Sequence, residues 1–165
     1  MKTINFLKIF IIVSALVFSL SGCEKGLFCT SGKGDIISEF RSVPDFTELE
    51  AAGAFDVVVM EGDVKTVEIV GHQNIVQKVN TTVSHNKLEV DLKRGCYNDY
   101  VLTIYVTTPD IKEVKLSGSG TITIEEFESL SELDVIIEGS GDIYGEHNFP
   151  INNLYFLING SGNID

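Results

Sequence analysis

Hydrophobic and polar residues alternate in short segments along most of the chain beyond residue 40. β-Branched residues are frequent in these segments, and turn residues such as Gly, Asp and Asn bound them. A period of two puts successive side chains on opposite faces of a strand, so the pattern predicts β-strands and very little helix. Only residues 74–78 could form a helical turn. The strongest strand signals lie at residues 55–60, 66–70, 87–92 and 101–106.

Two short polar segments between strand signals are predicted to be hairpin turns. Ser84, His85 and Asn86 lie between residues 79–83 and 88–92, which favours a turn that joins two antiparallel strands. Gly62 and Asp63 predict the turn of an earlier hairpin in the same way.

The C-terminal part of the chain contains a repeat. Gly-Ser-Gly occurs at residues 118–120, 139–141 and 160–162, so that 139 − 118 = 160 − 139 = 21 residues separate the copies. Such a period, with apolar residues at matching positions, indicates stacked coils that bury their apolar sides against one another. Three apolar columns keep this register: Val114, Val135 and Phe156; Leu116, Ile137 and Ile158; and Ile122, Ile143 and Ile164. The glycines Gly118, Gly120, Gly139, Gly141, Gly160 and Gly162 are expected at tight corners with positive φ.

The 21-residue register does not extend through the first half of the chain. Residues 52–57 begin a similar strand, but the spacing is lost between there and Pro109. We therefore expect an all-β stack of 21-residue coils, solenoid-like, with an irregular or antiparallel N-terminal half that caps it. The alternative is an antiparallel sandwich in which the three motifs are unrelated hairpin turns, and the matched columns favour the stack.

The first residues have the three parts of a secretory signal. Lys2 and Lys8 are followed by an apolar stretch at residues 9–20 and by Leu20-Ser21-Gly22-Cys23, which resembles the lipobox of bacterial lipoproteins. A membrane-spanning anchor is the rival interpretation, but it needs about 20 apolar residues without such interruptions as Ser14. We predict a signal peptide at residues 1–22, a lipid on Cys23, a tether at 23–39 and one domain at 40–165.

Charge and cysteine content narrow the range of partners. The chain carries −12 at pH 7, and removal of residues 1–22 with their two lysines gives (12 − 2) − 24 = −14. So acidic a protein is a poor candidate for binding nucleic acid or anionic lipid, which needs clustered cations. Cys29 and Cys96 are expected to form a disulfide rather than two free thiols, because an even pair in a secreted protein usually closes.

No catalytic, cofactor-binding or metal-binding residues are predicted. His72, His85 and His147 are far apart in predicted turns and fit no metal pattern, so we expect exposed loop histidines. The Gly-Ser-Gly motifs lack the spacing of a nucleophile elbow. The acidic corners around Asp142 and Asp165 faintly suggest calcium, but turn-forming residues explain them more simply.

The ordered set of motifs resembles a known family, named for a putative auto-transporter adhesin, head GIN domain, which is common among lipoproteins of Bacteroidetes-type bacteria. The resemblance covers about residues 40–165 and implies a right-handed β-helix-like fold and a cell-envelope setting. Family members generally continue with more coil, whereas this chain stops at Asp165, so an open last edge is expected to reflect either truncation or a partner. The resemblance rests on residues 46–49, 55–59, 61–63, 71–75, 88–90 and 108–109 and on the Gly-Ser-Gly coils.

These observations lead to three functional hypotheses. The first is a lipid-anchored binding or adhesion module without catalytic activity, placed most simply at the outer membrane on its periplasmic or surface face. Its ligand would be a glycan or a protein, because stacked coils present a long repetitive surface. The second is a structural or regulatory envelope protein that self-associates or assembles through the edge at residues 158–165, and the third is a β-helix polysaccharide-active enzyme. The tyrosines could be aromatic platforms or packing residues: Tyr97, Tyr100, Tyr105, Tyr144 and Tyr155.

Overall fold

The computed structural model describes residues 29–125, 127–128, 130–146 and 150–165. Its elements are almost all strands, which confirms the all-β prediction, and its helix is the single turn α2 (Gln73–Val76). No helical segment in this part of the chain has the length and hydropathy needed to cross a bilayer. The strands are β1 (Thr30–Ser31), β2 (Ile36–Arg41), β3 (Glu48–Ala52), β4 (Asp56–Glu61), β5 (Thr66–His72), β6 (Val79–Ser84), β7 (Lys87–Leu92), β8 (Tyr97–Asn98), β9 (Leu102–Thr108), β10 (Glu113–Leu116), β11 (Thr121–Ile124), β12 (Leu130–Ile137), β13 (Asp142–Gly145) and β14 (Ile151–Ile158).

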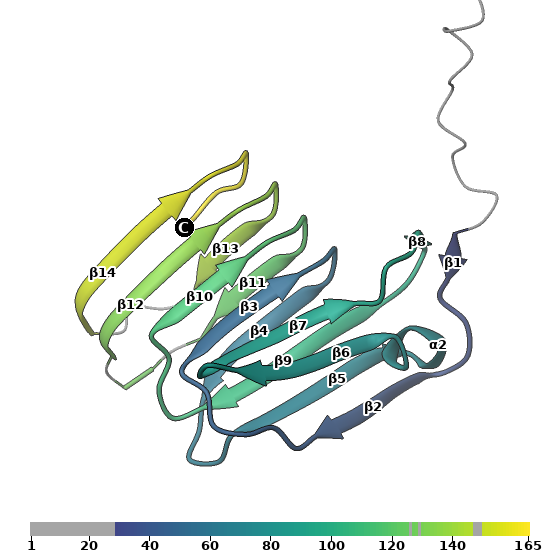
Figure 1. The fold of residues 1–165 in the computed structure, drawn as a ribbon, viewed down its shortest axis with the longest axis horizontal. Helices are drawn as coiled ribbons and strands as arrows, with labels where there is room; N and C mark the ends of the chain where they lie inside the picture. The colour runs from purple at the N-terminus through teal and green to yellow at the C-terminus, as the bar shows by residue number, and fades with distance from the viewer. Residues whose placement is uncertain (1–28, 126, 129, 147–149) are drawn as a thin grey trace, which may run out of the picture.

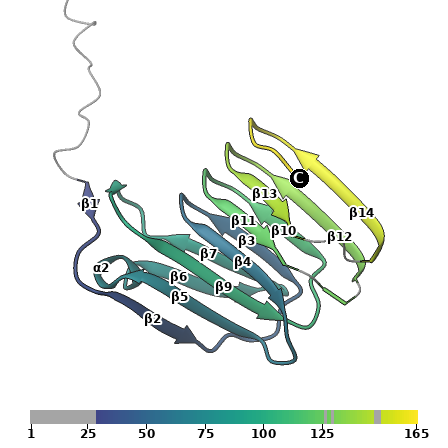
Figure 2. The same ribbon diagram turned by 180° about the vertical axis from the view of Figure 1, so that it is seen from behind.

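Two six-stranded sheets lie face to face and enclose the core (Figure 1). The first, which we call the β3 sheet, has the order β14-β12-β10-β3-β7-β6. The second, the β4 sheet, has the order β13-β11-β4-β9-β5-β2, and Figure 2 shows both sheets from the opposite side of the molecule. Both sheets mix parallel and antiparallel pairs, and β1 and β8 form a small parallel pair beside them.

The 21-residue repeat corresponds to pairing between neighbouring strands. β10, β12 and β14 pair in parallel so that Val114, Val135 and Phe156 lie side by side. β11 and β13 pair in the same way, and an isolated parallel bridge joins Ile143 to Ile164. The predicted apolar columns therefore run across hydrogen-bonded neighbours and point between the two sheets.

The expectation for the N-terminal half is only partly right. β2, β5 and β6 are antiparallel to their neighbours and lie at one end of the sheets, as expected of a cap. However, β3 and β4 pair in parallel with β10 and β11, and β7 and β9 pair in parallel with β3 and β4. The parallel arrangement continues here although the sequence spacing does not, because the segment from β5 to β9 is inserted between β4 and β10.

One predicted hairpin is confirmed and the other is wrong. β6 and β7 are antiparallel, and the turn residues His85 and Asn86 have φ angles of 49° and 69°. Such left-handed angles match the twist of a two-residue hairpin turn. The segment at Gly62 and Asp63 joins β4 to β5, but β9 lies between these two strands, so they do not form a hairpin.

The paired part of the chain begins before residue 40. β2 pairs with β5 along its length and β1 pairs with β8, so residues 30–31 and 36–39 of the expected tether are strand residues. Cys29 and Cys96 form a disulfide next to β1 and β8, and the Thr30 amide donates to the Cys96 carbonyl at 2.8 Å. The predicted signal peptide at 1–22 and the lipidation site Cys23 lie outside the described residues.

The Gly-Ser-Gly corners require glycine for a different reason from the one predicted. None of their six glycines has a left-handed φ, and the only described glycine that does is Gly34, at 84°. Instead, successive corners touch, so that a Cβ on Gly118 would collide with the carbonyl oxygen of Gly53. Gly139 and Gly160 meet the oxygen of the corner before them in the same way. The repeated glycine therefore permits close approach of one backbone to the next.

The two ends of the core differ. Between the two sheets, residues such as Leu49 and Ile104 are fully buried, and each such side chain stabilises the fold by roughly 1.5–3 kcal/mol. At the end formed by β2 and β6, the Arg41 guanidinium bridges the two sheets, donating to the carbonyls of Val79 at 2.6 Å and Val76 at 3.3 Å. At the other end no described element covers the inward side chains of β14.

Candidate functional site

The outer face of the β3 sheet is covered by paired charges. Lys87 lies 2.7 Å from Glu113 and Lys115 lies 2.8 Å from Glu138. Lys112 forms a third pair with Glu132. Most outward positions on this sheet therefore hold charged residues: Glu48, Glu50, Lys87, Glu89, Asp91, Glu113, Lys115, Glu132 and Asp134.

These ion pairs hold the lysines in their charged form. The pKa of Lys87 is raised chiefly because its amine donates a hydrogen bond to Glu113. The pKa of Lys115 is raised chiefly by the corresponding bond to Glu138, with further attraction from Glu50. Partners already neutralise these amines, so the face presents mainly excess carboxylate to solvent.

The outer face of the β4 sheet has a different composition. Its outward positions alternate with buried Val, Leu and Ile and hold mostly threonine, aromatic and aliphatic residues. Phe40 is 69% exposed and Tyr144 is 38% exposed. We call this surface the threonine–aromatic face, defined by Phe40, Val58, Met60, Val70, Thr103, Tyr105, Thr107, Thr121, Thr123 and Tyr144.

One row of side chains crosses this face at right angles to the strands. In it Tyr105 of β9 pairs with Val58 of β4, Val58 with Thr123 of β11, and Thr123 with Tyr144 of β13. On the other side of Tyr105 the row continues through the carboxylate Glu68 of β5 to Phe40 of β2. At about 4.8 Å per strand, Tyr144 lies roughly 14 Å and Phe40 roughly 10 Å from Tyr105. The row therefore spaces three aromatic rings along a flat surface.

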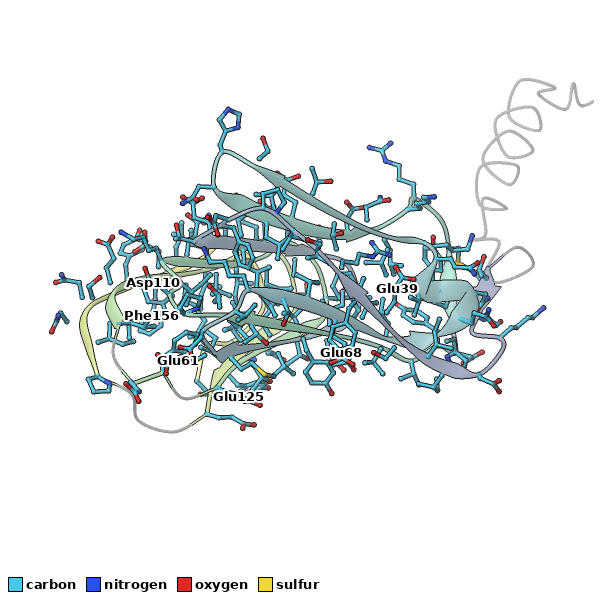
Figure 3. The ribbon with its side chains drawn as sticks, turned by 90° about the horizontal axis from the view of Figure 1, so that it is seen from below. Glu39, Glu61, Glu68, Asp110, Glu125 and Phe156 are labelled. Carbon is cyan, nitrogen blue, oxygen red and sulfur yellow. A yellow bond between two sulfur atoms is a disulfide. The ribbon has the colours of Figure 1, made fainter. Side chains whose placement is uncertain are left out.

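Three carboxylates, Asp56, Glu68 and Asp142, lie among the residues of the threonine–aromatic face. Glu68 of β5, labelled in Figure 3, accepts a hydrogen bond from the Ser38 hydroxyl at 2.5 Å. Asp142 accepts two bonds at 2.8 Å from the backbone and side-chain nitrogens of Asn163. None of the residues that define the face is cationic. The face can contact a neutral ligand through ring faces and hydroxyl groups, while its carboxylates add hydrogen-bond acceptors and repel anionic ligands.

The histidines and the suggested calcium site have other roles. His85 lies in an exposed turn as expected, and His147 lies outside the described residues. His72 is wrongly expected to be an exposed loop residue, since it ends β5, is half-buried and accepts the Val101 amide on Nδ1 at 2.9 Å. Within the described ranges, no group of three or more His, Cys, Asp or Glu side chains is arranged to hold a metal.

The five tyrosines separate into three places. Tyr97 and Tyr100 lie near the disulfide, with ring centres 6.1 Å apart, and burial raises the pKa of Tyr100. Tyr105 and Tyr144 share the threonine–aromatic face, whereas Tyr155 points outward from the β3 sheet beside Asp134. The alternation of apolar and polar residues within each strand predicts which tyrosines point outward. Only the order of the strands in the sheet brings Tyr105 and Tyr144 onto one surface.

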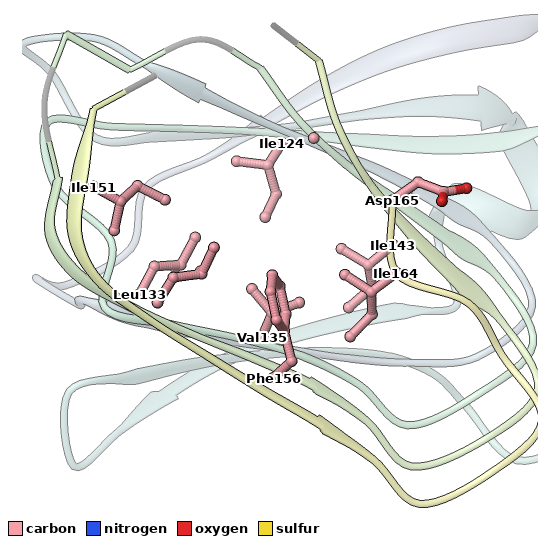
Figure 4. Close-up of a pocket in the computed structure, with 10 residues that line it drawn as sticks. Ile124, Leu133, Val135, Ile143, Ile151, Phe156, Ile164 and Asp165 are labelled. Atoms are coloured by element: carbon pink, nitrogen blue, oxygen red, sulfur yellow. The ribbon is translucent and has the colours of Figure 1, made fainter. Parts of the chain in front are cut away.

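The uncovered end of the core forms a shallow apolar hollow of about 270 Å³ (Figure 4). Phe156 and Leu154 of β14 point toward the core yet remain 51% and 46% exposed. Ile158 follows the same pattern at 45%. The hollow is lined by Ile124, Leu133, Val135, Ile143, Gly145, Ile151, Leu154, Phe156, Ile164 and Asp165.

Comparisons with known proteins place this architecture among related folds. The family described as "Putative auto-transporter adhesin, head GIN domain" matches residues 45–165. A "putative adhesin" from Parabacteroides merdae has a similar fold, with a TM-score of 0.68 and 17% identity over 79% of this chain and 55% of that chain. A "putative lipid binding protein" from Parabacteroides distasonis has a TM-score of 0.61 and 17% identity over 82% of this chain and 70% of that chain. A "putative adhesin" from Bacteroides fragilis has a TM-score of 0.52 and 12% identity over 82% of this chain and 98% of that chain.

These likenesses show the fold alone, because sequence identities this low do not carry a function from one protein to another. The chain spans only about half the length of the Parabacteroides merdae structure. A search of curated proteins finds no match.

Proposed function

Because this chain belongs to the family "putative auto-transporter adhesin, head GIN domain", we propose that it is a binding module of the bacterial cell envelope without catalytic activity. In this proposal the coils form a right-handed solenoid held at the outer membrane by lipid on Cys23. The family, the adhesin descriptions of proteins with a similar fold, and the parallel pairing at 21-residue spacing all support it.

The ligand that the geometry supports best is an extended, neutral glycan on the threonine–aromatic face. The observation that carries this proposal is the row from Phe40 through Tyr105 to Tyr144. Aromatic rings pack well against the apolar C–H faces of sugars, and neighbouring threonine hydroxyls can both donate and accept hydrogen bonds. An extended protein segment is the other ligand class, and the absence of cations among the defining residues makes an acidic segment a poor fit.

Glycan binding by the purified mature protein tests this site. Replacing both Tyr105 and Tyr144 with alanine should abolish measurable binding, since each aromatic anchor typically contributes about 2 kcal/mol, or roughly thirtyfold in affinity. The Tyr155→Ala variant is the matched control, because that ring points outward from the opposite sheet. Equal effects of the double variant and the control would count against this face as the ligand site.

Lipid anchoring is tested separately. Incorporation of labelled fatty acid should be lost in the Cys23→Ser variant, and protease treatment of intact cells should reveal which face of the membrane carries the domain. Removal by protease indicates a surface position and supports adhesion. Protection indicates a periplasmic position, and the ligand is then sought within the envelope.

A second candidate function is assembly through the uncovered end of the core. The inward side chains Leu154, Phe156 and Ile158 are about half exposed there, and among the described strands β14 pairs on one side only. An exposed strand edge of this kind can pair with another chain. Dimerisation that depends on concentration and disappears in the Ile158→Glu variant would favour this candidate.

Enzymatic action on polysaccharides is the third hypothesis. Cleavage of a glycan by the purified protein, detected as new reducing ends, would overturn the non-catalytic proposal.

A further inference from the structure

The cations of the described chain fall into two groups. Five of them form ion pairs: Arg41, Lys65, Lys87, Lys112 and Lys115. The remaining four, Lys33, Lys78, Lys93 and Arg94, have no ion-pair partner among the described residues. We call these four the basic end.

The members of the basic end come together from distant parts of the sequence. The Lys93 amide donates to the Lys78 carbonyl at 2.9 Å, and Arg94 follows directly. The Lys33 amide donates to the side chain of Asn74, in the helical turn that precedes Lys78, at 2.7 Å. Lys33, Lys93 and Arg94 are exposed and Lys78 is partly exposed.

This end of the molecule is also the end nearest the proposed anchor. β1, β8 and α2 lie together there (Figure 1), and Arg94 is two residues from Cys96, whose disulfide partner is Cys29. If Cys23 carries lipid, 29 − 23 = 6 residues separate the lipid from the disulfide. Six residues span at most about 20 Å. The basic end is therefore held close to the membrane surface.

We propose that the basic end docks on anionic phospholipid headgroups and holds the domain upright on the membrane. Four cations lie at this end against the carboxylates of Asp35, Asp91 and Asp99, and Asp91 already accepts a hydrogen bond from Asn80. The strong negative charge of the rest of the chain is screened beyond about 8 Å at physiological salt, so it does not prevent contact at this end. The inference rests on the proposed lipid anchor and adds an orientation to it: the end with β1, β8 and α2 faces the bilayer.

Lysine footprinting of the full mature lipoprotein tests this orientation. The protein is reconstituted into vesicles of phosphatidylcholine alone or mixed with phosphatidylglycerol, labelled with an amine-reactive reagent, and analysed by mass spectrometry. Labelling of Lys33, Lys78 and Lys93 should fall several-fold in the anionic vesicles and recover in high salt. Labelling of Lys65 and Lys112 should not change, because these lysines lie elsewhere.

Two charge variants sharpen the test. A cation near an anionic surface contributes about fivefold in binding, so the Lys93→Gln, Arg94→Gln variant should lose most of the protection at Lys33 and Lys78. The Lys65→Gln, Lys112→Gln variant removes the same charge from other places and should keep that protection.

Each other outcome contradicts a different statement. Equal labelling in both vesicle types overturns the docking while leaving the anchor intact. Protection by dissolved inorganic phosphate with phosphatidylcholine vesicles overturns the membrane surface as the partner. Failure of the protein to float with either vesicle overturns the lipid anchor, and this orientation with it.

Discussion

Replacement of Gly139 with alanine tests whether the close approach of successive Gly-Ser-Gly corners stabilises the fold. A Cβ at this position would collide with the Gly118 carbonyl oxygen and lie 3.0 Å from the carbon and nitrogen of that residue. The same oxygen accepts hydrogen bonds from the amides of Ser140 at 2.9 Å and Gly141 at 3.1 Å. Since the obstacle is backbone, the corner must move away and both bonds must lengthen.

The expected loss of stability follows from these contacts. Two hydrogen bonds contribute about 1 kcal/mol each, and overpacking adds about 1–3 kcal/mol. Alanine also lowers the conformational entropy of the unfolded chain, which stabilises the folded state by about 0.4–1 kcal/mol. The Gly139→Ala variant should therefore lose about 3 kcal/mol of unfolding free energy. With a urea dependence near 2 kcal/mol per molar, the midpoint of unfolding falls by about 1.5 M.

Urea unfolding followed by far-ultraviolet circular dichroism measures this shift. Gly145→Ala is the matched control, because its Cβ would meet only the Asp165 carbonyl oxygen, at an ordinary 3.7 Å. The control should stay within about 1 kcal/mol of the original protein. Equal midpoints for the two variants would refute the argument that close approach of the corners selects glycine.

Three further predictions concern the disulfide, the two ends of the core and alkaline pH. Reduction of the bond between Cys29 and Cys96 should lower the unfolding free energy by about 2–4 kcal/mol, and an unchanged urea midpoint would contradict this. Leu133→Ala should lower the unfolding free energy by about 2–5 kcal/mol because Leu133 is buried. Phe156→Ala should lower it by only about 1 kcal/mol because that ring is half exposed. Equal losses would mean that this end of the core is covered. The pKa of Lys87 is raised by its hydrogen bond to Glu113. The stabilisation of the folded state by Lys87 is therefore complete below the ordinary pKa of about 10.5 and is lost as pH rises through the raised pKa. Stability above pH 10.5 should thus fall more steeply in the original protein than in Lys87→Gln, and parallel curves would argue against the contribution.

Local and periodic features were predictable from the sequence. Strands follow from the alternation of apolar and polar residues, and the turn at His85 and Asn86 follows from its position between two strand signals. The repeat predicts that Val114, Val135 and Phe156 become neighbours, and the register confirms it. Such features need only residues that are adjacent or equally spaced, so a pattern along the chain contains them.

The order of strands in space was decided by tertiary structure. β3 lies between β7 and β10, so Leu49 pairs with Leu88 and with Val114, at sequence separations of 88 − 49 = 39 and 114 − 49 = 65 residues. Unequal separations leave no period to detect, and their pairing depends on which apolar faces can be buried together. The insertion of β9 between β4 and β5 is missed for the same reason.

The chemistry of the surfaces was likewise decided by tertiary structure. The alternation within each strand predicts that Tyr105 and Tyr144 point outward, but only the pairing of β9, β4, β11 and β13 places them in one row. The net charge of −12 conceals the basic end, because its cations come from separate segments that lie at one end only when β1, α2 and β7 come together. Composition sums charge along the chain, whereas binding depends on which charges and rings share a surface.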